Sequence, residues 1–537
     1  MEENFATVLE TVADVMSERG AITQGDRVVT WARLDAAAAR LAGHLSAAGI
    51  GPGHRVAICL FNSPEYFEAV FAALKCRAVP VNVNYRYKAE EMTYIFRDAD
   101  VRAVLYDASV ADRLGPALDG LQRRPALVQL GGTDLLDGAV QFEDALGAEP
   151  MSRIERGNDE WLMYTGGTTG MPRGVLSRHS WLFGVVAANG FLNLGVPYPQ
   201  SLDELRTTLE GLKPGGETMV TLPGPPLMHG AGMYTSLGAL LAGGRVACLT
   251  ERGYDPDDLA STIERQRVDT VGIVGDVFAV PLADALDRAV AAGRPYDLSS
   301  LKRILSYGVM WSAESKARLL AHADFLCRDL VAATEGGPFA VAETRRGDPV
   351  STARFRLLPG CRIIDDTGRD VEPGSGRIGR LAAVSDEHIR YLGDEAKTAE
   401  TFRTIDGVRY VVPGDLVSID ADGVVTFHGR GSGVINSGGE KVFAEEVENC
   451  IRRHPAVRDV MVVGVPDPRW GHRIAAVVAL QPGATLTLAD LRAHVGAELA
   501  DYKRPTALRL CEELKRSPSG KADLRWAAEV AAEAGDG

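Results

Sequence analysis

Residues 161–175, WLMYTGGTTGMPRGV, have the composition of an anion-binding loop. An apolar strand-like run leads into glycines and threonines, and a cation, Arg173, follows. Glycines let consecutive backbone N–H groups converge on one anion, and hydroxyl and guanidinium groups add further donors. The stretch therefore predicts a polyphosphate cradle, although it is neither a GxxxxGK[ST] loop nor a GxGxxG loop. The alternative is a flexible surface turn.

Elements that could position this loop alternate along the first half of the chain. Strand-like runs at 55–60, 79–83 and 101–106 are separated by helix-length segments such as 64–74, which predicts βαβ units with parallel sheets covered on both faces. After residue 358, short strands between turns predict a small β-barrel. Residues 445–499 predict a compact α+β unit, the glycine-rich residues 429–433 predict a hinge, and the tail after Trp526 predicts a fraying helix.

Charge and cysteine content narrow the function classes. The chain has 537 residues, and 58 Lys and Arg against 72 Asp and Glu give a net charge of −14. This acidic balance argues against general nucleic-acid binding, but a small anionic ligand needs only a local cluster of donors. Seven scattered cysteines without a CxxC pair indicate reduced thiols. We expect a cytoplasmic protein with no membrane span.

Several ordered motifs resemble the adenylate-forming superfamily, and among its members the acyl-CoA synthetases. The loop resembles the signature YT[SG]GTTGxPKGV, and the others are PLMHGAG at 226–232, Thr334–Glu335, Gly414–Asp415, Gly429–Arg430, GGEKV at 438–442 and SGK at 519–521. In detail these motifs most resemble actinobacterial ligases for steroid side chains and other polycyclic acids. The match extends over most of the chain.

The resemblance implies a two-step ligase reaction. A carboxylate attacks the α-phosphate of ATP to give an acyl-adenylate and pyrophosphate, and the thiol of coenzyme A then displaces AMP. It also implies a large N-terminal lobe of two βαβ-type subdomains plus the small barrel (residues 1–430), a hinge (431–433) and a mobile α+β C-terminal domain (434–537).

The resemblance assigns roles residue by residue. Glu335 would hold Mg²⁺, Lys521 would stabilise the transition state of adenylation, and His229 would be the gate residue. Asp415 would accept hydrogen bonds from the ribose hydroxyls. The remaining candidates for nucleotide and coenzyme A binding are Thr165, Gly166, Gly167, Thr168, Thr169, Gly170, Arg173, Gly308, Thr334, Arg430, Gly438, Gly439 and Lys441. Taken alone, Asp415 would be a turn carboxylate, His229 a core histidine and Lys521 a solvated lysine.

Three motifs depart from the family pattern. Arg173 replaces the lysine of the loop, and Val331 and Ala332 replace the aromatic residue and glycine of the YGxTE motif, where the aromatic ring would stack on adenine. Ser432 occupies a hinge position that usually carries Asp or Lys. The first two changes fall on the ATP half of the reaction.

These departures leave two alternatives to a complete ligase. One is an enzyme that mainly forms the thioester from a preformed acyl-adenylate, supplied by a separate adenylating enzyme. The other is a non-catalytic protein that binds acyl groups or nucleotides. A carrier-protein acceptor in place of coenzyme A, and a homodimer, also stay open.

The acyl group is expected to be bulky. The segments that form the pocket wall in this family correspond to 227–234, 270–278 and 306–311, and here they include Gly230, Ala231, Gly232, Gly272, Gly275 and Gly308. Small side chains leave room for a wide apolar group. We therefore expect a polycyclic or terpenoid/steroid-like carboxylate rather than a straight fatty acid.

Overall fold

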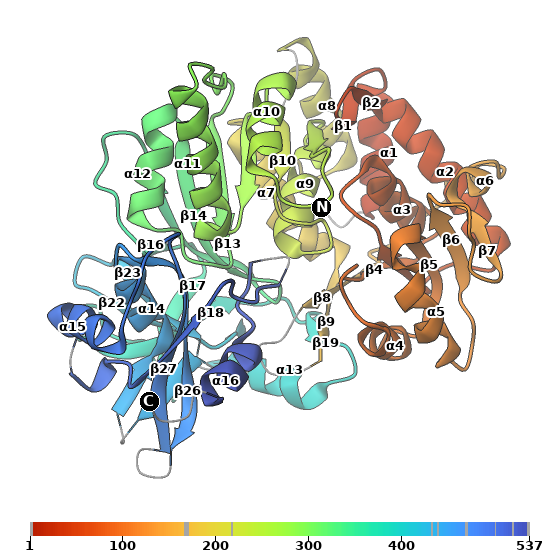
Figure 1. Cartoon of the computed structure of the whole chain (residues 1–537). Helices are drawn as coiled ribbons and strands as arrows, with labels where there is room; N and C mark the ends of the chain where they lie inside the picture. Colours follow the sequence, from red (N-terminus) through yellow and green to blue (C-terminus); the bar gives the residue numbers. More distant parts are fainter. Residues whose placement is uncertain are drawn as a thin grey trace.

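Three β-sheets organise the fold (Figure 1). The structure is a computed structural model, and it describes residues 4–165, 171–215, 219–430, 433–437, 440–467, 471–499, 501–517 and 520–533. In Figure 1 the red-to-orange N-terminal segment lies on the right and the green helices α11 (Gly275–Ala291) and α12 (Ala313–His322) lie on the left, with α10 (Pro256–Gln266) between them. The blue C-terminal segment lies at the lower left, below the green helices.

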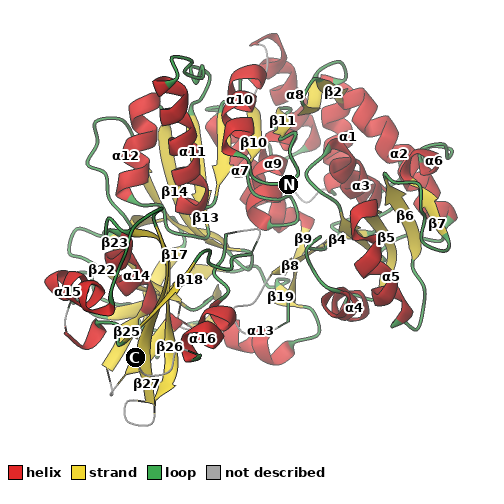
Figure 2. Ribbon diagram, in the orientation of Figure 1, coloured by secondary structure: helices red, strands yellow, loops and turns green. Residues whose placement is uncertain are grey.

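The first half of the first sheet consists mostly of parallel strands. Its strands are, in spatial order, β2 (Arg27–Thr30, antiparallel), β1 (Gly20–Gln24), β11 (Arg245–Cys248), β10 (Val220–Pro223), β12 (Thr270–Ile273), β13 (Arg303–Tyr307) and β14 (Leu326–Ala333). The faces of this sheet are covered by helices (Figure 2). Val271, Ile273 and Ile304 pack with α10, α11 and α12 on one face. Residues of the opposite face alternate with them along the same strands.

The antiparallel half of the same sheet contains the short strands expected to form a barrel. It continues through β15 (Gly337–Thr344), β16 (Arg354–Leu357), β23 (Val425–Arg430), β22 (Asp415–Ile419), β18 (Ile378–Val384), β21 (Val408–Val411) and β20 (Phe402–Ile405), with β17 (Cys361–Ile364) on β18. In the described part of the chain these strands do not close on themselves. They extend the large sheet because β16 pairs with both β15 and β23.

The second sheet contains the predicted βαβ units. Its order is β19 (Arg390–Tyr391), β9 (Arg173–Arg178), β8 (Glu160–Thr165), β4 (Val79–Asn82), β3 (Arg55–Cys59), β5 (Val101–Asp107), β6 (Ala126–Leu130) and β7 (Ala139–Gln141). The associated helices are α1 (Phe5–Met16), α2 (Trp31–Ala47), α3 (Pro64–Lys75), α4 (Ala89–Asp98), α5 (Ala111–Asp119) and α6 (Phe142–Ala145). The strands and the helix predicted at 55–106 are confirmed within one or two residues.

The third sheet belongs to the C-terminal residues. It contains β25 (Glu440–Phe443), β24 (Val434–Ser437), β27 (Gly471–Leu480), β26 (Val457–Asp467) and β28 (Ala507–Cys511), with helices α14 (Ala444–Arg452), α15 (Leu488–Glu498) and α16 (Leu524–Ala532). The prediction of a fraying tail is wrong for α16, because Ala527 and Ala531 are buried against β26 and β27. Further helices, which precede the C-terminal sheet in the chain, are α7 (His179–Asn193), α8 (Leu202–Leu212), α9 (Gly230–Leu241) and α13 (Glu395–Thr401).

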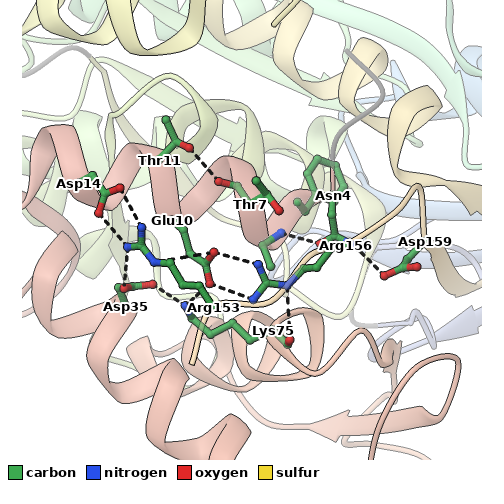
Figure 3. Close-up of polar contacts among 12 residues, drawn as sticks. Asn4, Thr7, Glu10, Thr11, Asp14, Asp35, Lys75, Arg153, Arg156 and Asp159 are labelled. Carbon is green, nitrogen blue, oxygen red and sulfur yellow. Dashed lines mark hydrogen bonds and ion pairs between the residues drawn. The ribbon is translucent and has the colours of Figure 1, made fainter. Parts of the chain in front are cut away.

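A buried ion-pair cluster ties α1 to the neighbouring elements (Figure 3). Glu10 of α1 accepts hydrogen bonds from Lys75 Nζ at 2.7 Å and from both terminal nitrogens of Arg156 at 2.8 and 3.0 Å. Lys75 also contacts Asp35 of α2 at 2.6 Å. The side chains of Glu10, Lys75 and Arg156 are at most 6% exposed, so each charge depends on its partners.

No helix among the described residues is both long enough and apolar enough to cross a membrane.

Candidate active site

A cavity of about 1390 Å³ is lined by residues from all three sheet regions. Five predicted site residues line it: Thr165, His229, Gly308, Thr334 and Lys521. They come from segments more than 350 residues apart, since Thr165 ends β8 and Lys521 lies between β28 and α16. The fold therefore brings most of the separately recognised motifs to one place.

Some of the predicted residues lie outside the described structure. These are Gly166, Gly167, Thr168, Thr169 and Gly170 of the loop, and Gly438 and Gly439; the hinge residue Ser432 is among them as well. For Arg430 and Lys441 only the backbone is described, on β23 and β25.

Lys521 reaches the cavity on a short turn of the C-terminal region. Ser517 and Lys521 close this turn, because the Ser517 N–H donates to the Lys521 carbonyl at 2.8 Å and the Lys521 N–H donates to the Ser517 hydroxyl at 3.1 Å. Gly520 sits close to β12 and α11, where an added Cβ would lie 3.2 Å from Val274 Cγ1. The turn therefore inserts against the parallel half of the first sheet, with its lysine beside His229.

His229 is an uncharged imidazole in the cavity wall. Burial, together with the positive charges of Lys521 and Arg86, lowers the pKa of His229 to about 3. Its Nε2 atom has no hydrogen-bond partner among the residues that the structure describes. A neutral imidazole at this position can hydrogen-bond a ligand or swing away from it without a change of charge.

Glu335 follows β14 and is held by a tyrosine. The Tyr391 hydroxyl donates to Glu335 Oε1 at 2.8 Å. Burial and the charge of Glu335 raise the pKa of the Tyr391 phenol, so the donor keeps its proton. Glu335 directly follows Thr334, which lines the cavity, although Glu335 itself is not among the lining residues. One carboxylate at this place fits the way in which Mg²⁺ is bound by one or two carboxylates plus substrate oxygens.

Asp415 and Arg430 are cross-strand neighbours. Their Cα atoms are paired in register on the antiparallel strands β22 and β23, and Asp415 is 2% exposed. Both were assigned to the ribose by resemblance, from motifs separated in sequence. The register therefore brings the backbones of the two predicted ribose-binding residues together.

Gly308 adopts a backbone conformation that favours glycine. It follows β13 with φ +80°, and an added Cβ would meet nothing within 4 Å. The conformation rather than crowding is therefore the reason for glycine at this position.

The lining of this cavity is locally basic, despite the negative net charge of the chain. Cations outnumber carboxylates among the lining residues, with Arg86, Lys88, Lys515, Arg516, Lys521 and Arg525 against Glu91 and Asp523. Such a local excess can bind a polyphosphate. This is the local donor cluster that the composition left open.

The two changes from the family pattern that affect the ATP half of the reaction lie only partly in the cavity lining. Arg173 begins β9, and its Nε atom is 3.5 Å from Asp394 Oδ2 with the side chain 40% exposed. Val331 packs with the core of the antiparallel half, whereas Ala332, Ala333 and Thr334 line the cavity. Neither Arg173 nor Val331 is among the lining residues.

Sequence reasoning missed two amides that hold the loop containing His229. Asn82 donates to the carbonyls of Tyr164 at 2.9 Å and Met228 at 2.6 Å, and it accepts from the Tyr164 N–H at 2.6 Å. Asn62 accepts from the Leu227 N–H at 2.7 Å. An asparagine at the end of a buried apolar strand, where this residue is unfavourable, was the available signal.

We expect Asn82→Leu to lower kcat/KM by at least about tenfold, because it releases Thr165 and His229 from a fixed geometry. Asn158→Leu is the matched control. Asn158 makes two similar bonds to Ser180 away from the cavity. Steady-state kinetics well below each variant's unfolding temperature check this. Equal losses in both variants would mean that Asn82 only stabilises the fold.

Comparison with known proteins defines the class. Residues 9–385 match the family of AMP-binding enzymes, and residues 446–521 match the C-terminal domain of AMP-binding enzymes. The chain belongs to this adenylate-forming family, and within it to the acyl-CoA synthetases.

Relatives that match over nearly their whole length show which acyl-CoA synthetases this chain is similar to. A 3-oxocholest-4-en-26-oate–CoA ligase of Rhodococcus rhodochrous is 37% identical, with 98% of this chain and 96% of the relative covered. A ligase of Mycobacterium tuberculosis, named for medium- and long-chain fatty acids and for 3-oxocholest-4-en-26-oate, is 38% identical over the same shares. An ATP-bound MatB structure from Rhodopseudomonas palustris is 25% identical, with a TM-score of 0.78 and 99% of both chains covered. An anthranilate CoA ligase with bound anthranoyl-AMP superposes with a TM-score of 0.81 at 22% identity over 99% of this chain and 98% of that one, which supports the fold alone.

Proposed function

We propose that this enzyme converts a polycyclic or steroid-like carboxylic acid to its coenzyme A thioester through an acyl-adenylate. The observation that carries the proposal is a cavity that joins the Lys521 turn and Thr165 to a large volume between the strands β10, β12, β13 and β14 and the helices α7 and α9. The names of the full-length relatives support a steroid acid as substrate.

In the first half-reaction the acid attacks the α-phosphate of ATP and pyrophosphate leaves. Lys521 stabilises the negative charge that develops on the transferring group. Thr165 and the loop after it bind the phosphates, Asp415 and Arg430 bind the ribose, and Gly308 and Thr334 line the nucleotide site. Mg²⁺ held by Glu335 would neutralise charge on the phosphates.

In the second half-reaction the coenzyme A thiol displaces AMP from the acyl group. We propose that residues 1–430 form the N-terminal lobe, that 431–433 form the hinge, and that 434–537 rotate between the two steps. Gly438, Gly439 and Lys441 would then face the thioester-forming site, and His229 would clear the path for the thiol. Seven unpaired cysteines support a cytoplasmic location.

A second candidate is an enzyme with a weakened first half-reaction. It is favoured by Arg173, which contacts Asp394 rather than the cavity. A half-exposed pair at this distance contributes about 0–1 kcal/mol, so a polyphosphate can compete for Arg173. We therefore favour the complete ligase.

A substrate panel tests the proposal. We expect kcat/KM for thioester formation to be at least about tenfold higher for steroid-type or polycyclic acids than for C8–C16 fatty acids, because a wide site leaves a narrow chain poorly packed. Release of AMP with ATP and coenzyme A present is the measurement. A preference for the linear acids would contradict the steroid assignment, and no turnover of any acid would contradict the ligase assignment.

A further inference from the structure

The cavity continues from the reacting groups along one face of the parallel strands. Thr221, Thr270 and Arg303 are adjacent across β10, β12 and β13 by their register. Arg303 precedes Gly308 by five residues, which corresponds to about 17 Å of strand at ~3.3 Å per residue. The cavity lining includes Tyr307 and Gly308 at one end and Thr221 and Thr270 at the other.

The middle of this cavity is apolar and closed by two helices. Leu305 and Leu330 line it from the sheet, and Val186 lines it from α7. On the helix side, α7 and α9 touch at Gly190 and Gly238, where a Cβ on Gly190 would lie 2.0 Å from the Gly238 carbonyl oxygen. A rigid apolar body can therefore fill this section, with its carboxylate toward Lys521.

The far end, in contrast, is lined by polar groups. Thr270 Oγ1 donates to Asp269 at 2.6 Å and accepts from Arg303 at 3.0 Å. The backbone carbonyl of Asn193 accepts a hydrogen bond from Arg303 at 3.2 Å, and its side-chain Oδ1 accepts one from Arg328 at 3.0 Å. Both the backbone oxygen and Oδ1 of Asn193 are thus used, and with respect to the described residues its side-chain N–H groups can still donate to a ligand.

Thr221 is the exception in this network. It is 0% exposed, it lines the cavity, and its hydroxyl has no hydrogen-bond partner among the residues that the structure describes. Buried polar groups are normally paired, so an unpaired hydroxyl at the end of a ligand cavity indicates a partner carried by the ligand.

We propose that this far end recognises an oxygen atom that the acyl group carries at its end remote from the carboxylate. The oxygen, of a ketone or a hydroxyl group, accepts a hydrogen bond from the Thr221 hydroxyl, beside the amide of Asn193. This proposal rests on the proposed function and refines it: the substrate is an elongated rigid acid with a distal oxygen. A fatty acid would instead place a methyl group against an unpaired hydroxyl.

The test compares two steroid acids that differ only at the distal position, a 3-oxo acid and its 3-deoxo analogue. The wild-type enzyme should prefer the 3-oxo acid by at least about tenfold in kcat/KM, since a site that pairs a substrate oxygen discriminates against the analogue without it. Thr221→Val should reduce the preference to about twofold or less by lowering activity on the 3-oxo acid alone. Its thermal stability should stay equal or rise, because a methyl group replaces an unpaired hydroxyl.

Thr23→Val is the matched control. Thr23 lies on β1 of the same sheet, is 0% exposed, and also has a hydroxyl without a partner among the described residues, but it does not line the cavity. This variant should keep the wild-type preference. Equal activity of the wild-type enzyme on both acids, or a preference that survives Thr221→Val, would overturn the proposal.

A binding measurement tests the distal subsite independently of the ligase assignment. Non-reactive acyl-sulfamoyl adenosines with and without the distal oxygen should show the same difference, at least about tenfold in Kd, by calorimetry. A difference in Kd without turnover would uphold the subsite and contradict the ligase. Turnover of both acids with equal Kd values would uphold the ligase and overturn the subsite, and binding of neither analogue would overturn both.

Discussion

Lys521→Ala is expected to lower acid-dependent exchange between pyrophosphate and ATP by about 10²–10³-fold, the usual effect of removing one group that stabilises developing charge. Lys521 lines the cavity beside His229, on a turn that inserts against β12 and α11. Thioester formation from synthetic acyl-AMP and coenzyme A should fall much less, because the phosphoryl transfer is already complete in that substrate.

Arg509→Ala is the control for this variant. Arg509 is an exposed cation on β28 of the same C-terminal region, and it does not line the cavity. Loss of such an exposed cation should change the exchange rate by no more than about threefold. Exchange that survives in Lys521→Ala would remove this lysine from the first half-reaction.

Glu10→Gln is expected to destabilise the N-terminal region by about 3–5 kcal/mol at pH 7. The glutamine leaves Arg156 buried without the one ionic partner that it has among the described residues, and it deprives Lys75 of one of two carboxylates. Urea unfolding of the wild type and the variant, followed by tryptophan fluorescence, measures the difference. Asp112→Asn removes an exposed ion pair with Arg113 and should cost less than about 1 kcal/mol.

The same variant gives a pH test with a defined sign. Burial alone would raise the pKa of Glu10, but the hydrogen bonds from Arg156 and the charge of Lys75 outweigh it and hold this pKa below the ordinary value of 4.5. A carboxyl whose pKa is lower in the folded state stabilises the protein above about pH 4.5, and this contribution is lost as the pH falls through the folded pKa. The difference between wild type and Glu10→Gln should therefore shrink below pH 4.5. A difference that is constant down to pH 3 would contradict the assignment.

Sequence patterns correctly predicted the helices and strands that are determined by neighbouring residues in the chain. The strand ending at Thr165 and the helix α3 follow from apolar runs and from Pro64 at the helix start. The predicted barrel was not observed as a closed unit because closure depends on which strand edges pair, and short strands carry no signal for this. The packing of α16 on β26 and β27 is likewise a tertiary property.

The sequence predicted those site residues that belong to a recognisable motif. It did not predict the residues that reach the site through contacts between distant parts of the chain. His229 and Lys521 were recognised from PLMHGAG and SGK, and the structure places both at one cavity. Tyr391, Asn82 and Thr221 act through contacts that chain topology creates, such as the bond from Asn82 to Met228 across 146 residues. For Asn82 the local signal was an asparagine at the end of a buried apolar strand, whereas nothing in the sequence around Tyr391 or Thr221 separates them from ordinary strand positions.

Acid-dependent exchange of labelled pyrophosphate into ATP by the wild-type enzyme, with a steroid acid present and coenzyme A absent, tests adenylate formation most directly. We predict exchange that requires the acid and stops when the acid is withheld. Absence of exchange, while synthetic acyl-AMP is still converted to its thioester, would contradict the complete ligase and leave an enzyme of the second half-reaction alone.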